Sequence, residues 1–135
     1  MNRDSPLNQP ELQKIVDFLR QGLPDIQLIY LFGSRADGSQ KPNSDWDIAL
    51  LGQQPLDNVQ RWELAQELAT LLNADVDLVD LLSASTVLNM QVVFKGRLLY
   101  GEINIKDVFE TKVYSMYGRL QESRQDIIEQ FLADK

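Results

Sequence analysis

Two spacings of apolar residues divide the chain into alternating segments. Apolar runs with a period near two predict strands, and a spacing of three to four residues predicts helices. Strands are expected at residues 26–32, 45–51, 75–81 and 97–100, and helices at 8–22, 57–72, 85–94 and 104–132. This order predicts an α/β or α+β fold, in which helices flank a small mixed β-sheet.

The ends and buried faces of the helices follow from capping residues and apolar stripes. Asn8 is a candidate cap for the first helix, and Ser83 or Ser85 for the third. The second helix, capped by Asp57, is expected to bury six residues: Val59, Trp62, Leu64, Leu68, Leu71 and Leu72. The last helix would break, if anywhere, near Gly118, and its stripe comprises Val113, Tyr114, Tyr117, Leu120, Ile127 and Phe131. That stripe can pack on its own sheet, on a partner protein or on a second copy of the chain.

The strand predicted at residues 26–32 is apolar on nearly both faces, because Ile29 and Leu31 alternate with Leu28 and Tyr30. A strand that is covered on both faces lies inside a sheet rather than at its edge. We therefore expect this strand at the centre of the sheet.

Length and composition limit the kind of protein. The chain has 135 residues, which suits one globular domain over residues 1–135, with a helical segment at about 104–132. Its apolar stretches are far shorter than a bilayer span and it has no cysteine, so a cytoplasmic protein without membrane contact is expected. The net charge of −7 disfavours direct binding to nucleic acid.

The chain also contains no histidine. Catalysis must therefore use carboxylates, hydroxyls, Lys, Arg or Tyr, and a bound metal would need oxygen ligands. Mg²⁺ accepts such ligands, whereas Zn²⁺ and Cu²⁺ sites normally recruit imidazole or thiolate. Magnesium is therefore the expected metal.

Asp45 and Asp47 flank Trp46 at the start of a predicted strand. Because side chains alternate along a strand, both carboxylates leave the same face, with Cα atoms about 7 Å apart. Two such carboxylates can share a pair of Mg²⁺ ions for phosphoryl or nucleotidyl transfer. Taken alone, the short pattern is more often a solvated strand end.

Gly33 and Ser34 directly follow the strand at residues 26–32 and precede a candidate helical turn at residues 35–37. Free backbone N–H groups and a hydroxyl at such a place can cradle phosphates. The alternative is an ordinary turn with a capping serine.

The two motifs together are more specific than either one. Gly33-Ser34, ten further residues and then Asp45-Trp46-Asp47 resemble the signature of the DNA polymerase β-like nucleotidyltransferase superfamily. The wider segments 31–36 and 44–50 resemble its minimal nucleotidyltransferase branch. This resemblance implies the nucleotidyltransferase fold.

A third carboxylate lies on a neighbouring strand in that superfamily, often within Val-Asp-Leu-Val, and residues 76–79 have this sequence with Asp77 at the matching position. In a regular strand Asp75 would share the face of Asp77, and Asp80 would lie on the opposite face. Some of these three acidic residues are expected to be only solubilising charges at a sheet edge.

The resemblance implies a role for each motif residue. Asp45 and Asp47 would ligate two Mg²⁺ ions, while Asp77 would help to hold one ion and activate the incoming hydroxyl. Gly33 and Ser34 would hold the triphosphate of ATP.

Arg35 follows the Gly-Ser pair, and its five-donor guanidinium would bind a nucleotide phosphate or, equally, a surface carboxylate.

The resemblance also implies a function. Minimal nucleotidyltransferases are often encoded beside a HEPN-domain ribonuclease toxin and act as its antitoxin, by transferring AMP from ATP to a toxin tyrosine. The small acidic chain suits such a partner, with which it would assemble. One alternative is an adenylyltransferase for small molecules such as aminoglycosides, which usually carries an additional helical domain. The other is a non-catalytic module that masks the toxin by binding.

Overall fold

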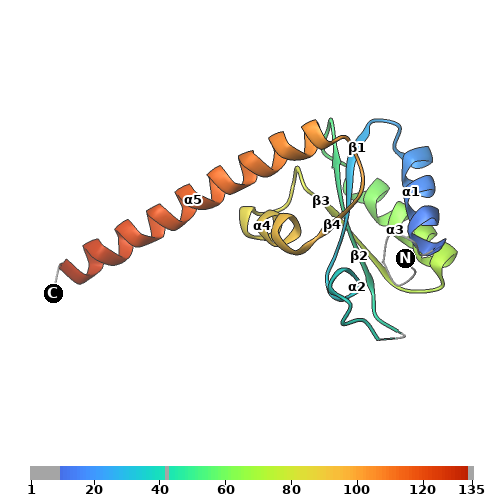
Figure 1. The fold of residues 1–135 in the computed structure, drawn as a ribbon, viewed down its shortest axis with the longest axis horizontal. Coiled ribbons are helices and arrows are strands. Elements are labelled where there is room, and N and C mark those ends of the chain that lie inside the picture. Colours follow the sequence, from blue (N-terminus) through green and yellow to red (C-terminus); the bar gives the residue numbers. More distant parts are fainter. Residues whose placement is uncertain (1–9, 42, 134–135) are drawn as a thin grey trace.

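A mixed sheet of four strands in the order β3-β2-β1-β4 forms the centre of the molecule (Figure 1). The computed structural model describes residues 10–41 and 43–133. The strands are β1 (Ile26–Phe32), β2 (Trp46–Gly52), β3 (Val76–Asp80) and β4 (Arg97–Tyr100). β1 pairs antiparallel with both β2 and β4, whereas β2 and β3 run parallel. The predicted central position of the first strand is therefore confirmed.

Five helices accompany the sheet in the described residues: α1 (Pro10–Gly22), α2 (Ser34–Asp37), α3 (Asn58–Leu72), α4 (Thr86–Lys95) and α5 (Ile103–Ala133). α1 and α3 cover one face of the sheet, while α4 and the start of α5 cover the other (Figure 1). The predicted mixed sheet flanked by helices is confirmed. Asn8, the candidate cap of the first helix, lies outside the described residues.

Alternate residues of the strands belong to two separate hydrophobic clusters, one on each face. Ile29, Ile48 and Leu78 pack with α1 and α3. Tyr30 and Ala49 pack with α4 and the first turns of α5. Side chains two residues apart on a strand share a face. Asp47 precedes Ala49 by two positions, and Asp77 precedes Val79, the partner of Ala49 on β3, by two, so both also lie on the α4 face.

The buried face of α3 differs from the prediction. Leu64, Ala65 and Leu68 are buried, but Val59, Trp62 and Leu71 are 62%, 63% and 46% exposed, so the expectation that all three are buried is wrong. A helix that lies on a sheet buries a single stripe of side chains, and these three residues fall outside it. The helix has more apolar residues than one stripe can cover.

α4 and α5 resolve two points that the sequence left open. Ser85 rather than Ser83 caps α4, and its hydroxyl oxygen accepts a hydrogen bond from the N–H of Leu88 at 3.1 Å. α5 continues through Gly118 without a break. An isolated glycine costs a helix only about 1 kcal/mol, and no proline accompanies it. The side chains of Ile127 and Phe131 lie outside the described residues, and no helix among the described ones is long and apolar enough to cross a membrane.

Tyr30 anchors α5 to the centre of the sheet. Its hydroxyl donates a 2.7 Å hydrogen bond to Glu110 Oε2, and Lys106 Nζ lies 3.1 Å from Glu110 Oε1. Burial and the adjacent Glu110 carboxylate raise the pKa of the Tyr30 phenol far above its usual value. The phenol therefore remains a hydrogen-bond donor at every ordinary pH.

Replacing Tyr30 by phenylalanine is expected to lower the free energy of unfolding by about 1–2 kcal/mol, because a partly buried carboxylate loses its donor. Urea unfolding followed by circular dichroism measures this change. The control is Tyr117→Phe, whose hydroxyl only accepts an exposed bond from Gln121 and should cost less than about 0.5 kcal/mol. Equal stabilities of the two variants would mean that Lys106 alone holds Glu110.

Candidate active site

The predicted site residues lie near the end of β1 and the starts of β2 and β3. Gly33 and Ser34 connect β1 to α2, Asp45 precedes β2, and Asp47 is its second residue. In the sheet register Asp47 pairs with Phe32 on one side and with Asp77 on the other. The structure therefore brings the Gly-Ser turn and the carboxylates of two neighbouring strands together, as the sequence predicted.

The backbone of Gly33 lies against the Asp47 carboxylate. Its φ of 73° lies in the left-handed region, and a Cβ atom built on it would overlap Asp47 Oδ2. The N–H groups of Ala36 and Asp37 donate to the Gly33 carbonyl at 3.0 and 3.4 Å, which starts α2 immediately after the glycine. Only glycine satisfies both the backbone angle and the space at this position.

The three carboxylates repel one another. Partial burial raises the pKa of Asp47, and the negative charges of Asp77 and then Asp45 raise it further. Asp47 is half-buried, while Asp45 and Asp77 are exposed. Such a cluster favours the binding of cations, since a cation would relieve the repulsion.

The donor set of the site fits Mg²⁺ by chemical type, because every candidate ligand is a carboxylate oxygen. Among the residues that the structure describes, no three acidic side chains already stand in the close arrangement of a complete metal cage. Mg²⁺ is commonly held by only one or two carboxylates, with phosphate oxygens and water completing its shell. The site thus fits an ion that arrives with a nucleotide.

Arg35 holds the loop between α2 and β2 against the Gly-Ser turn. Its Nε and Nη2 groups donate to the Ser44 carbonyl at 3.1 and 2.8 Å, and its guanidinium lies 4.1 Å above the Trp46 ring. These contacts fix the backbone on both sides of Asp45. Neither partner was anticipated from the sequence, although planar stacking on a nearby aromatic ring is a common use of arginine. A phosphate contact of Arg35 stays a prediction.

Arg97, which the sequence analysis did not single out, also supports the turn. Its Nε group donates to the carbonyl of Ala36, 61 residues away in the chain. This bond ties the start of β4 to α2. Local sequence patterns carry no signal for a contact over such a separation.

The Polymerase beta, Nucleotidyltransferase family matches residues 13–104, which include all of these site residues. The chain belongs to this nucleotidyltransferase family. Over 128 residues it is 52% identical to the protein adenylyltransferase MntA of Shewanella oneidensis, covering 95% of this chain and 92% of that protein. The family match therefore spans both motifs.

Solved structures with similar sequences also resemble this nucleotidyltransferase. A crystal structure of a toxin–antitoxin with AMP-PNP has a TM-score of 0.84 at 52% identity, covering 92% of this chain and 99% of that chain. A complex of tri-AMPylated Shewanella oneidensis HEPN toxin with MNT antitoxin has a TM-score of 0.78 at 49% identity, covering 90% and 96%. Both relatives share the fold over nearly their whole length.

The structure separates Asp77 from Asp80 as candidates for the third carboxylate of the nucleotidyltransferase, while Asp75, which precedes β3, stays a candidate. Asp77 is in register with Asp47. Asp80 is 6% exposed, and its carboxylate accepts hydrogen bonds from the N–H groups of Leu56 and Leu82 at 2.8 and 3.0 Å. It also accepts one from the Ser83 hydroxyl at 3.1 Å. Asp80 therefore stabilises the turn after β3, and Asp77 is in the position to act with Asp47.

Substituting Asp80 by asparagine should affect stability, whereas the same substitution of Asp77 should affect activity. Asp80→Asn is expected to lower the free energy of unfolding by about 2 kcal/mol, because a buried acceptor of three bonds loses its charge. Asp77→Asn should leave stability unchanged and greatly reduce nucleotidyl transfer. Urea unfolding and a transfer assay on the same samples test both. Full activity of Asp77→Asn would remove this residue from the site.

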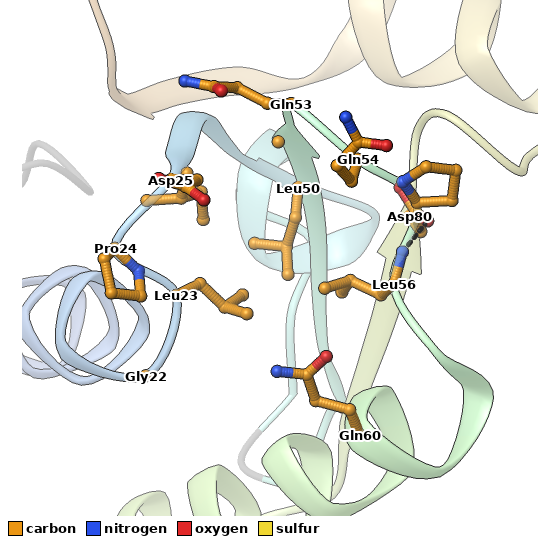
Figure 2. Close-up of a pocket in the computed structure, with 13 residues that line it drawn as sticks. Gly22, Leu23, Pro24, Asp25, Leu50, Gln53, Gln54, Leu56, Gln60 and Asp80 are labelled. Atoms are coloured by element: carbon orange, nitrogen blue, oxygen red, sulfur yellow. Dashed lines mark hydrogen bonds between the residues drawn. The ribbon is translucent and has the colours of Figure 1, made fainter.

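A cavity of about 220 Å³ lies at the opposite end of β2 from Asp47, and Figure 2 shows the residues that line it. Leu23, Leu50 and Leu56 meet there, and the amide of Gln60 points towards them (Figure 2). Asp80 lines this cavity, whereas the predicted site residues of the nucleotidyltransferase do not: Gly33, Ser34, Arg35, Asp45, Asp47 and Asp77. The chemistry is therefore expected on the exposed α4 face, where a large acceptor has access, and not inside this cavity.

Proposed function

We propose that this nucleotidyltransferase transfers AMP from ATP to a tyrosine of a HEPN-domain toxin and thereby acts as its antitoxin. The observation that carries the proposal is the position of Asp47 between the Gly33 turn and Asp77, near the start of β2, an inner strand of the sheet. Three relatives that are about half identical to this chain support the proposal. One is a protein adenylyltransferase, one is part of a toxin–antitoxin solved with AMP-PNP, and one is an antitoxin in complex with an AMPylated toxin.

The proposed reaction forms a bond between the tyrosine oxygen and the α-phosphorus of ATP. The bond from that phosphorus to the oxygen bridging to the β-phosphate breaks, and pyrophosphate leaves. Asp77 accepts the phenolic proton directly or through water. Gly33 and Ser34 bind the triphosphate through backbone N–H groups and a hydroxyl, since the first N–H groups of α2 have no partner within the helix. Arg35 supports this turn by its contacts with Ser44.

Asp45, Asp47 and Asp77 would hold two Mg²⁺ ions together with the phosphates of the nucleotide. When bound, these ions supply positive charge that stabilises the phosphorane-like transition state and lowers the pKa of the attacking hydroxyl. The protein contributes the fixed register of β2 and β3, which sets the spacing of Asp47 and Asp77. We further propose that residues 1–135 act as one nucleotidyltransferase domain in the cytoplasm, where ATP and Mg²⁺ are supplied.

Labelled ATP decides between transfer and its two alternatives. The protein is incubated with ATP labelled at the α-phosphate, Mg²⁺ and the HEPN-domain protein encoded beside it. Label on a tyrosine of that protein, lost with Asp47→Asn, is the expected result. Silencing of the toxin at equal stoichiometry without label would support a masking module. Label that appears only on an aminoglycoside would support a small-molecule enzyme.

A further inference from the structure

α2 is a single helical turn that cannot hold its position by itself. Helices of this length are unstable in water without tertiary contacts, because few backbone bonds offset the ordering of the chain. α2 has four residues, and the Gly33-Ser34 turn stands at its start. The side chain of Ala36, which is 2% exposed, packs into the cluster of α1 and α3. The orientation of the turn therefore depends on the contacts that other elements make with α2.

Arg97 makes one of these contacts from β4. Its Nε group donates to the Ala36 carbonyl oxygen. A helix leaves its last carbonyl groups without helical N–H partners, and a charged donor forms a stronger hydrogen bond than a neutral one. Because Ala36 is almost fully buried, water has little access to replace this donor. The bond therefore holds α2 in one place.

The backbone that carries Arg97 is itself fixed. Arg97 pairs with Leu31 in the sheet. Gly96, the residue before it, donates its N–H to the Val92 carbonyl oxygen at 2.7 Å, and a Cβ atom on Gly96 would overlap that oxygen. The contact with Ala36 therefore couples α2 to the sheet and to the end of α4.

Arg97 acts from the face of the sheet opposite to the carboxylates. Paired residues of antiparallel strands point their side chains to the same face, and Leu31, the partner of Arg97, belongs to the cluster of α1 and α3. Asp47 and Asp77 lie on the α4 face. Arg97 therefore approaches α2 from behind the site, and its influence on a bound nucleotide passes through α2.

We propose that Arg97 is a positioning residue for nucleotide binding, which holds α2 so that the Gly33-Ser34 turn presents its N–H groups and hydroxyl to the triphosphate. The proposal rests on the proposed function only in placing the triphosphate at this turn, and it does not depend on the acceptor. Gly33 also lies against Asp47, so a turn that shifts moves relative to the carboxylates. Donors that are already in place bind a ligand more tightly than donors that must be ordered on binding, because the ordering costs free energy.

An unreactive nucleotide tests the proposal without an acceptor. Arg97→Met removes the donor and the charge but keeps a long side chain, whereas Arg97→Lys keeps the charge and a donor. Each full-length protein is titrated with α,β-methylene-ATP and Mg²⁺ in a calorimeter, since this analogue cannot release pyrophosphate. Arg97→Met is expected to weaken binding at least about tenfold, as the loss of an orienting partner does at metal sites. Arg97→Lys should recover most of this loss.

Lys95→Met is the matched control for charge. Lys95 is exposed like Arg97 and lies near the same end of α2. The pKa of Asp37 is lowered by its hydrogen bonds with Ser39 and also by the positive charge of Lys95. Because salt screens an exposed charge, Lys95→Met should bind the nucleotide within about twofold of the wild type. Equal losses in Lys95→Met and Arg97→Met would mean that positive charge alone attracts the nucleotide, which would overturn the proposal.

Hydrogen exchange separates positioning from a general loss of stability. The N–H groups of Ala36 and Asp37 donate to the Gly33 carbonyl, so their exchange reports the opening of α2. Without nucleotide, Arg97→Met should exchange these two amide protons at least about tenfold faster than the wild type, while the amide protons of β1 and β2 keep their rates. Unchanged exchange in α2, or an equal acceleration in the strands, would contradict a positioning role.

The failure of the proposed function gives a different result. If the wild type binds no α,β-methylene-ATP, the triphosphate assignment and the role of Arg97 are both overturned. Equal affinities of the wild type and Arg97→Met overturn the role of Arg97 alone. If both binding and exchange change as expected but no label reaches the toxin, only the acceptor is wrong. Where label is transferred, Arg97→Met should raise KM for ATP and leave kcat nearly unchanged, whereas Asp77→Asn should lower kcat.

Discussion

Replacing Asp47 by asparagine is expected to reduce AMP transfer by about a thousandfold or more while the protein still folds. Asp47 is the carboxylate that contacts both halves of the site, since the Gly33 backbone lies against it and Asp77 is its register partner. Asparagine has nearly the same shape but cannot supply a negative ligand or offset positive charge. Transfer of label from ATP to the toxin measures the loss. Activity within tenfold of wild type would exclude Asp47 from the catalytic group.

The same substitution has a predictable effect on stability. Because burial and the charges of Asp77 and Asp45 raise the pKa of Asp47, the folded protein binds this proton more tightly than the unfolded chain does. At neutral pH the ionised Asp47 therefore destabilises the fold, and Asp47→Asn should melt at the same or a higher temperature. As pH falls through the raised pKa, the wild type becomes protonated and the difference disappears. Melting in EDTA at about pH 7 and about pH 4 measures it. A variant that is less stable at neutral pH would contradict the assigned repulsion.

Replacing Gly33 by alanine should damage both stability and activity. The left-handed backbone angle costs a residue with a side chain about 1–2 kcal/mol, and the new methyl group must displace the Asp47 carboxylate. A misplacement of about 1 Å in a catalytic group can cost about a hundredfold in rate. Urea unfolding and label transfer measure the two losses separately.

Gly38→Ala is the matched control. Gly38 also has a positive φ, of 84°, but a Cβ atom there would meet nothing within 4 Å. This variant should therefore lose stability to backbone strain alone and keep its activity. If the two variants lose activity equally, backbone strain rather than the contact with Asp47 explains the effect of Gly33→Ala.

Much of this architecture could be predicted because the decisive signals are local. The apolar strand of residues 26–32, the glycine after it and the Asp-x-Asp pair each act within a few residues. The alternation rule also placed Asp80 on the face opposite Asp77, which agrees with its buried hydrogen bonds. Here chain geometry alone was sufficient.

The errors occurred where tertiary packing chooses among local options. α3 offers more apolar residues than it can bury, and only the position of the sheet decides that Leu68 is covered and Trp62 is not. The partners of Arg35 and Arg97 are backbone carbonyls, which have no sequence signature. A carbonyl contact depends on where the chain folds back, and this is not encoded in any short motif.

The double contact of Arg35 with Ser44 has a consequence for how the site tolerates change in chain length. Both ends of the loop between Gly33 and Ser44 are fixed. The Gly33 turn holds one end, and the Arg35 guanidinium holds the other through Ser44 and Trp46. Doubling the length of a flexible loop between fixed ends costs only about 0.6 kcal/mol in closure entropy. Residues 38–41 of this loop can therefore accept inserted residues that reshape the rim of the proposed nucleotide site, while the spacing of Asp47 and Asp77 is kept by strand pairing. Selection on a new acceptor and selection on the chemistry would then act on different stretches of the chain.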